Sequence, residues 1–223
     1  MDTNQTLRTS LLLAALTTSL WAADAPLRYE SSPRDNEMTI EGHATGHSWH
    51  VRGVIISGAF EVEPAWQKDP SLKSVTCLGE GKPSPKCEVS IPIRSLKSQV
   101  VAGASIMDDR MRKEMKATEF PQIRYKLTEL KPVGEVPASG TPVTFATKGQ
   151  LAIAGKTNEV SFPVTMERPE TDKLRFTGTL KTKMTAFNIT PPEFTIFGIG
   201  SKTADDITLT WKWTLGLKPP AGQ

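Results

Sequence analysis

Apolar and polar residues alternate along most of this chain, most clearly between residues 149 and 166. Leu151 and Ile153 alternate with small or polar neighbours, and every second residue from Val160 to Met166 is apolar. The residues between them, 154–158, include glycine and asparagine, which are typical of tight turns. A period of two on both sides of a turn predicts a β-hairpin with one apolar and one solvent-facing side.

The same alternation predicts further strands, near residues 27–34 and at 38–42, 47–62, 89–93, 123–128, 143–145, 174–184 and 207–215. The apolar residues change parity between Val51 and Val54, beside Gly53, which predicts a β-bulge or a strong bend. About eight alternating strands predict an all-β domain over residues 23–223. We expect an eight-stranded antiparallel β-barrel, since closure removes exposed edges, with a two-sheet sandwich as the alternative.

One stretch, Ser105 to Thr118, changes to a helical period. Ser105 is expected to cap the helix, and acidic residues follow near its start. Met107, Met111 and Met115 recur every four residues. This stripe is expected to pack the helix onto an end or flank of the sheet. The alternative is an adaptable thioether lid over an apolar opening.

The N-terminus has the order of a secretory signal peptide. Arg8 precedes the apolar run 11–16, and the small residues Ala22 and Ala23 follow. We predict cleavage after Ala22, so that residues 1–22 are removed and the mature protein is periplasmic or secreted. The apolar run is shorter than the roughly 20 residues that cross a bilayer, so no transmembrane segment is expected in the mature protein.

The two cysteines, Cys77 and Cys87, lie ten residues apart in the irregular segment 64–86. Since export exposes a protein to an oxidising compartment, we predict a structural disulfide between them. Zinc would need more ligands than these two thiols.

Charge and motifs exclude several function classes. The chain has 27 basic and 24 acidic residues and a net charge of +3. No basic stretch interleaves aromatic residues, so we expect no binding of nucleic acid. No Gly-x-Ser-x-Gly motif and no cysteine in a nucleophile context occurs, so we predict a protein that is not an enzyme.

All three histidines, His43, His47 and His50, fall within eight residues. On one continuous strand, His43 and His47 would share a face about 13 Å apart and His50 would point to the other face. Zinc–nitrogen bonds of about 2.0–2.1 Å do not tolerate that spacing unless the chain folds back, which Gly42 and Gly46 would permit. We therefore expect no metal site and no required cofactor.

Five segments, in order, match motifs of one known family: residues 42–49, 91–98, 108–111 with 120–125, 149–157, and 184–192 with 206–209. The first contains His47, Ser48 and Trp49 after two glycines, and the fourth is close to a G-x-L-x-I-x-G-x-T hairpin. Together they resemble the YceI-like family of exported lipid- or polyisoprenoid-binding proteins. The family's commoner opening, Asp-x-x-His-Ser, is absent, and the segment 64–86 looks like an elaboration.

The resemblance implies an extended, lipocalin-like antiparallel barrel with a long apolar molecule inside. The ligand would be a polyisoprenoid, an isoprenoid quinone or a fatty-chain lipid, bound non-covalently. The alternative is a structural or partner-binding envelope protein with a filled barrel. A homodimer is compatible with either function. We predict that twelve inward residues line the ligand: Trp49, Val51, Tyr125, Phe145, Leu151, Ile153, Phe162, Val164, Met166, Leu209, Trp211 and Trp213.

Overall fold

The computed structural model describes residues 25–100, 103–137, 142–196 and 199–219. The predicted signal peptide, residues 1–22, lies outside the described residues. Within the described part, five long strands are continuous: β7 (Gln122–Pro132), β8 (Val143–Ile153), β9 (Lys156–Glu170), β10 (Lys173–Lys183) and β12 (Ile199–Leu217). Three further long strands are each divided in two by one break. The first consists of β1 (Leu27–Ser31) and β2 (Glu37–Ala44), and the second of β3 (His47–Gly53) and β4 (Ser57–Val62). The third consists of β5 (Lys86–Pro92) and β6 (Lys97–Ser98).

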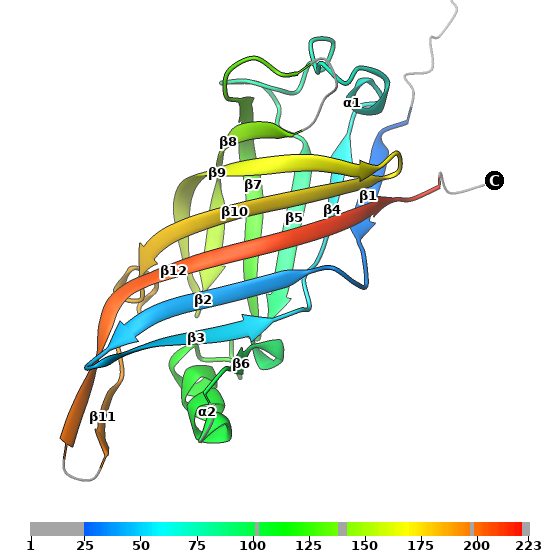
Figure 1. Cartoon of the computed structure of the whole chain (residues 1–223). Helices are drawn as coiled ribbons and strands as arrows, with labels where there is room; N and C mark the ends of the chain where they lie inside the picture. The colour runs from blue at the N-terminus through cyan, green and yellow to red at the C-terminus, as the bar shows by residue number, and fades with distance from the viewer. Residues whose placement is uncertain (1–24, 101–102, 138–141, 197–198, 220–223) are drawn as a thin grey trace, which may run out of the picture.

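These eight long strands form one closed antiparallel barrel. Strands that follow one another in the chain lie side by side in the sheet. The barrel closes where β12 meets the first long strand: β12 pairs with β2 over residues 203–212 and with β1 over residues 215–217. The other edge of β12 pairs with β10. The predicted eight-stranded barrel is thereby confirmed. In Figure 1, β9, β10, β12, β2 and β3 cross in front of β4, β5 and β7 at a steep angle.

The predicted bend near Gly53 is the break between β3 and β4. The neighbouring break, between β5 and β6, contains the short 3-10 turn η1 (Ile93–Ser95). Ile93 and Leu96 are completely buried there. A Cβ on Gly53 would lie 2.7 Å from the Leu96 side chain, so any larger residue there would force this buried side chain to move.

The predicted hairpin at 149–166 is formed by β8 and β9. Only Ala154 and Gly155 make the turn, with φ of 51° and 82°. Two positive φ values suit the right-handed twist of the flanking strands. A Cβ on Gly155 would meet the Phe120 ring at 2.5 Å, which ties this turn to the end of the helical segment.

The predicted helix is α2 (Ala104–Glu114), which lies below the barrel beside β6 (Figure 1). It ends earlier than expected, and Ser105 does not cap it. The N-cap is Gly103, whose φ of 75° brings the chain into the helix. Asp108 instead accepts a hydrogen bond from the Ser98 backbone N–H at 2.7 Å and lies 3.2 Å from the Lys97 ammonium. This buried carboxylate therefore fastens α2 to β6.

A second helix, α1 (Ala65–Lys68), was not predicted, because four residues show no helical period. Its Trp66 is completely buried and stacks on Phe145, with ring centroids 5.8 Å apart. Trp66 also meets the Phe60 ring at 5.2 Å. The segment 64–86 thus contributes an aromatic plug to the end of the barrel opposite α2 (Figure 1).

The predicted disulfide is absent from this structure, in which Cys77 and Cys87 are both free thiols. Cys87 is buried on β5, where it faces the barrel interior. Cys77 lies in the loop before β5, and its backbone N–H donates to the Glu63 carboxylate at 3.0 Å. The two side chains have different surroundings, which their spacing in the sequence does not reveal.

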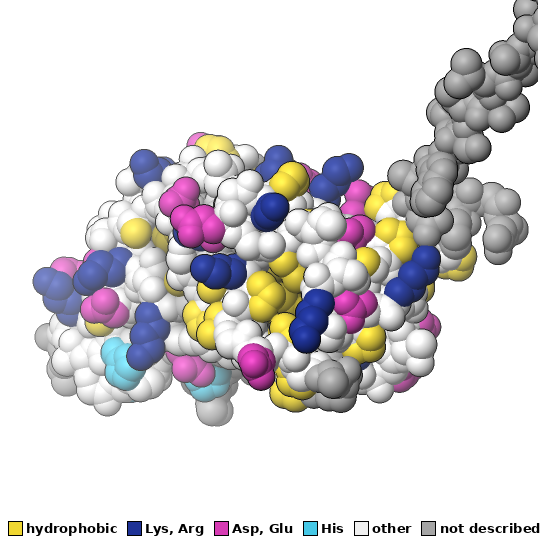
Figure 2. Space-filling view, turned by 90° about the horizontal axis from the view of Figure 1, so that it is seen from above, with side chains coloured by type: hydrophobic (Ala, Val, Ile, Leu, Met, Phe, Trp, Pro, Cys, Tyr) yellow, Lys and Arg dark blue, Asp and Glu magenta, His cyan; other side chains and the backbone are white. Residues whose placement is uncertain are grey.

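The remaining elements are η2 (Thr185–Phe187) and β11 (Glu193–Ile196). β11 pairs with the start of β12 and forms a flap that extends past the barrel on the α2 side (Figure 1). In the view from above, basic and acidic side chains are interspersed around apolar ones (Figure 2). No helix among the described residues is long and apolar enough to cross a membrane.

Candidate ligand-binding site

The inward side chains of the barrel leave two neighbouring cavities. The inner cavity lies in the body of the barrel and has a volume of about 120 Å³. The second, which we term the α2 cavity, has a volume of about 290 Å³ and is lined in part by α2. Leu209 of β12 lines both. The barrel interior therefore contains two consecutive chambers with Leu209 between them.

The inner cavity has a mainly aromatic and aliphatic wall. Tyr125, Phe162 and Trp211 form a continuous row, with centroid separations of 5.3 Å and 4.9 Å. Burial raises the pKa of the Tyr125 phenol well above its ordinary value. The phenol therefore stays neutral, as an apolar cavity requires. Apolar cavities of this size stay dry and accept apolar molecules.

The α2 cavity is covered by the methionine stripe. Met107, Met111 and Met115 all line it, together with Phe187 and Trp49. The stripe therefore packs α2 onto the end of the barrel, with Met115 in the core, and at the same time faces a cavity, so the structure agrees with both interpretations of it. Because thioether side chains adapt easily, this wall can fit ligands of more than one shape. The polar residues His47, Arg110 and Glu114 also border this cavity.

Glycines on the inner face hold three aromatic rings of the wall in place. A Cβ on Gly42 would lie 2.3 Å from the Trp49 ring, and one on Gly178 would lie 2.4 Å from the Trp211 ring. A Cβ on Gly149 would likewise clash with the Tyr125 ring. Each ring lies flat across the neighbouring strand, so the ring positions are fixed by the backbone.

The twelve predicted lining residues fall into four groups. Trp49, Val51 and Ile153 border the α2 cavity, and Leu209 borders both cavities. Six border the inner cavity: Tyr125, Leu151, Phe162, Val164, Trp211 and Trp213. Phe145 and Met166 border neither cavity; both are completely buried, and Phe145 stacks on Trp66.

Sequence reasoning missed several residues that border the cavities. Ile40 and Met38 of β2 were inside a predicted strand, and their alternation could have identified them. Met184 lies at the end of the predicted strand 174–184, whereas Phe187 lies in η2, where no pattern marked it.

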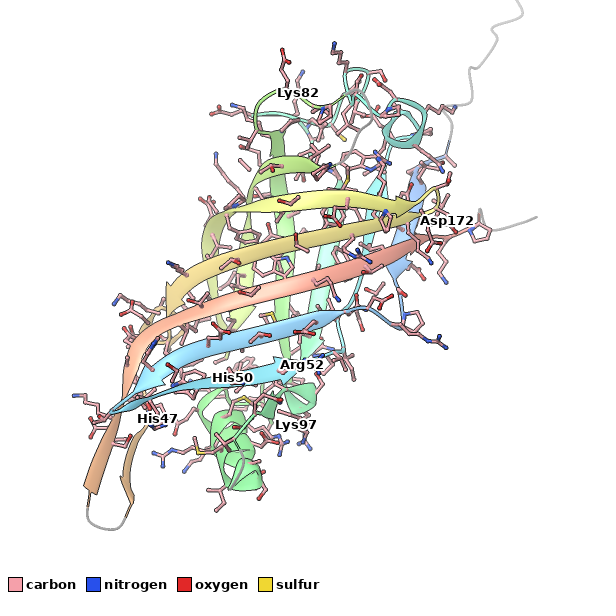
Figure 3. The ribbon with its side chains drawn as sticks, viewed as in Figure 1. His47, His50, Arg52, Lys82, Lys97 and Asp172 are labelled. Atoms are coloured by element: carbon pink, nitrogen blue, oxygen red, sulfur yellow. The ribbon has the colours of Figure 1, made fainter. Side chains whose placement is uncertain are left out.

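The distance argument made from the sequence treated the three histidines as lying on one continuous strand. In the structure they lie on two paired strands, β2 and β3. The chain folds back at Thr45 and Gly46, so that His43 pairs with Ser48, and His47 pairs with Ala44. Figure 3 shows His47 at the end of β3 and His50 farther along it. His47 therefore borders the α2 cavity from the same face as Trp49, and the predicted shared face of His43 and His47 is wrong. Over the described ranges, no group of three or more metal-ligating side chains occurs.

These features define a class: a small up-and-down barrel, plugged at one end by an aromatic side chain and covered at the other by a methionine-rich helix, with an apolar interior. The YceI-like domain profile matches residues 29–215, and the chain belongs to this family. A search of curated proteins gives no match.

Two solved structures have similar folds. The polyisoprenoid binding domain from Saccharophagus degradans is 11% identical, with a TM-score of 0.60 over 86% of this chain and 99% of that one. BcnA from Burkholderia cenocepacia is 18% identical, with a TM-score of 0.57 over 80% of this chain and 95% of that one. At these identities the likeness establishes the shared fold.

Proposed function

We propose that this protein binds a long apolar lipid non-covalently, with the chain of the lipid passing from the α2 cavity into the inner cavity. The observation that carries this proposal is the pair of apolar cavities that share Leu209. Each CH₂ group transferred from water into such a cavity contributes about 0.8 kcal/mol before ordering costs. No catalytic group is required for this function, and the proposal is one of binding only.

The family and the fold support a polyisoprenoid, an isoprenoid quinone or a fatty-chain lipid as the ligand. The Saccharophagus degradans structure is described as a polyisoprenoid binding domain, and the present chain covers nearly all of it. The predicted signal peptide supports export, so we propose that binding takes place in the periplasm or outside the cell.

Native mass spectrometry of the mature protein, purified from the envelope of its own cells, tests this function. We expect a stoichiometric adduct that solvent extraction identifies as a long-chain isoprenoid or fatty derivative. The extracted protein should then take up added polyprenol or quinone. A bare mass with no uptake would overturn the proposal and favour a structural or partner-binding protein.

A further inference from the structure

The two ends of the barrel differ in how firmly they are closed. At the plugged end, Trp66 is completely buried and stacks on Phe145, and its backbone carbonyl accepts a hydrogen bond from the Arg168 guanidinium at 2.7 Å. This guanidinium also lies over the Trp66 ring, 5.8 Å from a ring centroid, where a cation–π attraction adds to the packing. The opposite end is covered by α2 above a cavity of about 290 Å³. The α2 end is therefore the more easily opened of the two.

The cover of this end consists of two parts, which are fastened to different strands. α2 is fastened to β6 through the buried Asp108 carboxylate. The flap, formed by β11 and the start of β12, is fastened to the turn between β2 and β3. There the Thr45 N–H donates to the Lys202 carbonyl, and the Lys202 N–H donates to the Thr45 hydroxyl, both at 3.0 Å. Figure 1 shows both parts extending past the same end of the barrel.

The flap is also held where it leaves the barrel. The register of β12 with β2 shifts between Thr203 and Ile207. Asp205, within this irregularity, accepts hydrogen bonds from the Thr185 N–H at 2.9 Å and from the Thr185 hydroxyl at 2.6 Å. By contrast, β6 pairs with β3 only at Ser98 and Lys97, so α2 and β6 are joined to the sheet by a short ladder. Of the two parts of the cover, α2 is the one more easily displaced.

The seam between α2 and the flap borders the α2 cavity. Met107 and Arg110 line the cavity from α2, and Pro192 and Ser201 line it from the side of the flap. The Arg110 guanidinium crosses the seam and donates to the Glu193 carbonyl at 2.9 Å, at an exposed position. Water readily replaces an exposed hydrogen bond, whereas separating a buried carboxylate from its partners leaves an unpaired buried charge. The cover should therefore part at this seam and not at the contact of α2 with β6.

We propose that ligand enters and leaves the α2 cavity through the seam between α2 and the flap, and that the hydrogen bond from Arg110 to the Glu193 carbonyl is the latch that keeps the seam closed. Opening moves α2 away from the flap while Asp108 stays bonded to β6. This inference rests on the proposed function and adds the route by which a lipid reaches the cavity.

A reducible cross-link across the seam tests the route. Arg110→Cys and Glu193→Cys are introduced into a chain whose native thiols are removed by Cys77→Ser and Cys87→Ala, and the new pair is bridged with a bis-methanethiosulfonate. Ubiquinone uptake is followed by stopped-flow quenching of tryptophan fluorescence. The bridge should slow uptake by roughly tenfold or more, because the lid cannot open, and reduction should restore the rate. The reduced protein is its own control for folding.

The matched control is Thr45→Cys with Lys202→Cys in the same background, which links the flap to the turn that already holds it. This bridge should leave the rate of uptake unchanged. If it slows uptake as much as the seam bridge does, the flap itself moves and the inference is overturned. An unchanged rate with the seam bridged would also overturn it, since the ligand would then enter elsewhere.

Arg110→Ala tests the latch separately. Both the uptake and the release of ubiquinone should become faster, by roughly up to tenfold, because both pass through the open seam. If Arg110 instead contacted the ligand directly, its loss would speed release alone, and the latch would be wrong. Lys113→Ala removes an equal charge from an exposed position of the same helix and should change neither rate.

Binding by the unaltered protein separates this inference from the proposed function. It is measured by equilibrium transfer of ubiquinone, or of the fluorescent fatty acid parinaric acid, from detergent micelles. Binding of either probe supports the function even if the bridged and latch variants overturn the route. If neither probe binds, the proposed function fails, and the inference fails with it.

Discussion

Asn36 lies at the point where the first long strand is interrupted and the barrel closes. Between β1 and β2, no strand is available to pair with Thr214 of β12. The buried Asn36 side chain takes this role: its oxygen accepts the Thr214 backbone N–H at 2.8 Å, and its nitrogen donates to the Ser32 carbonyl. The Thr214 carbonyl accepts the Ser32 N–H at 2.8 Å. One amide therefore completes the hydrogen bonding of the closing seam.

Asn36→Ala should lower the free energy of unfolding by about 1–3 kcal/mol, because it leaves the buried Thr214 N–H without an acceptor. Urea titration monitored by tryptophan fluorescence measures the loss. The control is Asn158→Ala, whose amide also donates to a carbonyl, that of Ala186, at an exposed position. Equal losses in the two variants would show that the seam does not depend on Asn36.

The cysteines permit a second prediction at the scale of single residues. Burial raises the pKa of the Cys77 and Cys87 thiols to about 12. Since the thiolate is the reactive form, the folded protein should react slowly with an aromatic disulfide reagent near pH 8. Unfolding without reductant should release two reactive thiols per chain. If the unfolded, unreduced protein shows none, the cysteines are bridged and our assignment of free thiols is wrong.

At the scale of elements, the strands could be predicted because each has one buried and one exposed face. The hairpin of β8 and β9 and the break beside Gly53 both follow from alternation and its change of parity. The plug α1 could not be predicted, because its role depends on Trp66 meeting Phe145, a residue distant in the sequence. The start of α2 was also misjudged, since Gly103 replaces the expected serine cap through its backbone conformation alone.

Two carboxylates order the loop that follows the plug. Asp69 accepts hydrogen bonds from Ser71 and from the Ser74 backbone N–H, and these bonds hold its pKa well below its ordinary value. Burial raises the pKa of Glu63, but the backbone N–H groups of Cys77 and Thr76 outweigh it, and the net direction is down. Both carboxylates therefore favour the folded loop when they are ionised.

The sign of the pH dependence follows from these lowered pKa values. The stabilisation is complete above the unfolded-state pKa of about 4 and is lost as the pH falls further. Asp69→Asn should lower the melting temperature at pH 6, and the difference from the unaltered protein should shrink as the pH falls below about 4. Differential scanning calorimetry across this range measures both curves. A difference that stays constant with pH would contradict the role of the Asp69 charge.

At the scale of the whole molecule, alternation identified which faces point inward but not how far along the barrel each residue lies. Phe145 and Met166 were predicted to contact ligand, yet both are completely buried and border neither cavity, and Phe145 stacks on Trp66. Leu209 and Trp49 border the cavities because they lie nearer α2. The division into two chambers depends on residues from many strands that meet only after closure. No local pattern contains that information.

Leu209 offers the last prediction, since it is the residue shared by the two cavities. Leu209→Trp should fill the passage and prevent a long chain from reaching the inner cavity. Because each excluded CH₂ group loses about 0.8 kcal/mol, affinity for a long-chain quinone should fall on the order of tenfold or more. A short-chain quinone that fits in the α2 cavity should bind nearly as before. Micelle-transfer measurements with both ligands give the comparison.

The matched control is Thr210→Trp, which places the same indole on the adjacent, exposed position of β12. It should change neither affinity, because position 210 faces away from the barrel interior. Equal losses of long and short ligands in Leu209→Trp would mean that they occupy the same space, and the two-chamber path would be wrong. Selective loss of the long ligand would instead establish that the bound chain passes Leu209, so that the length of the barrel interior sets the length of lipid it can hold.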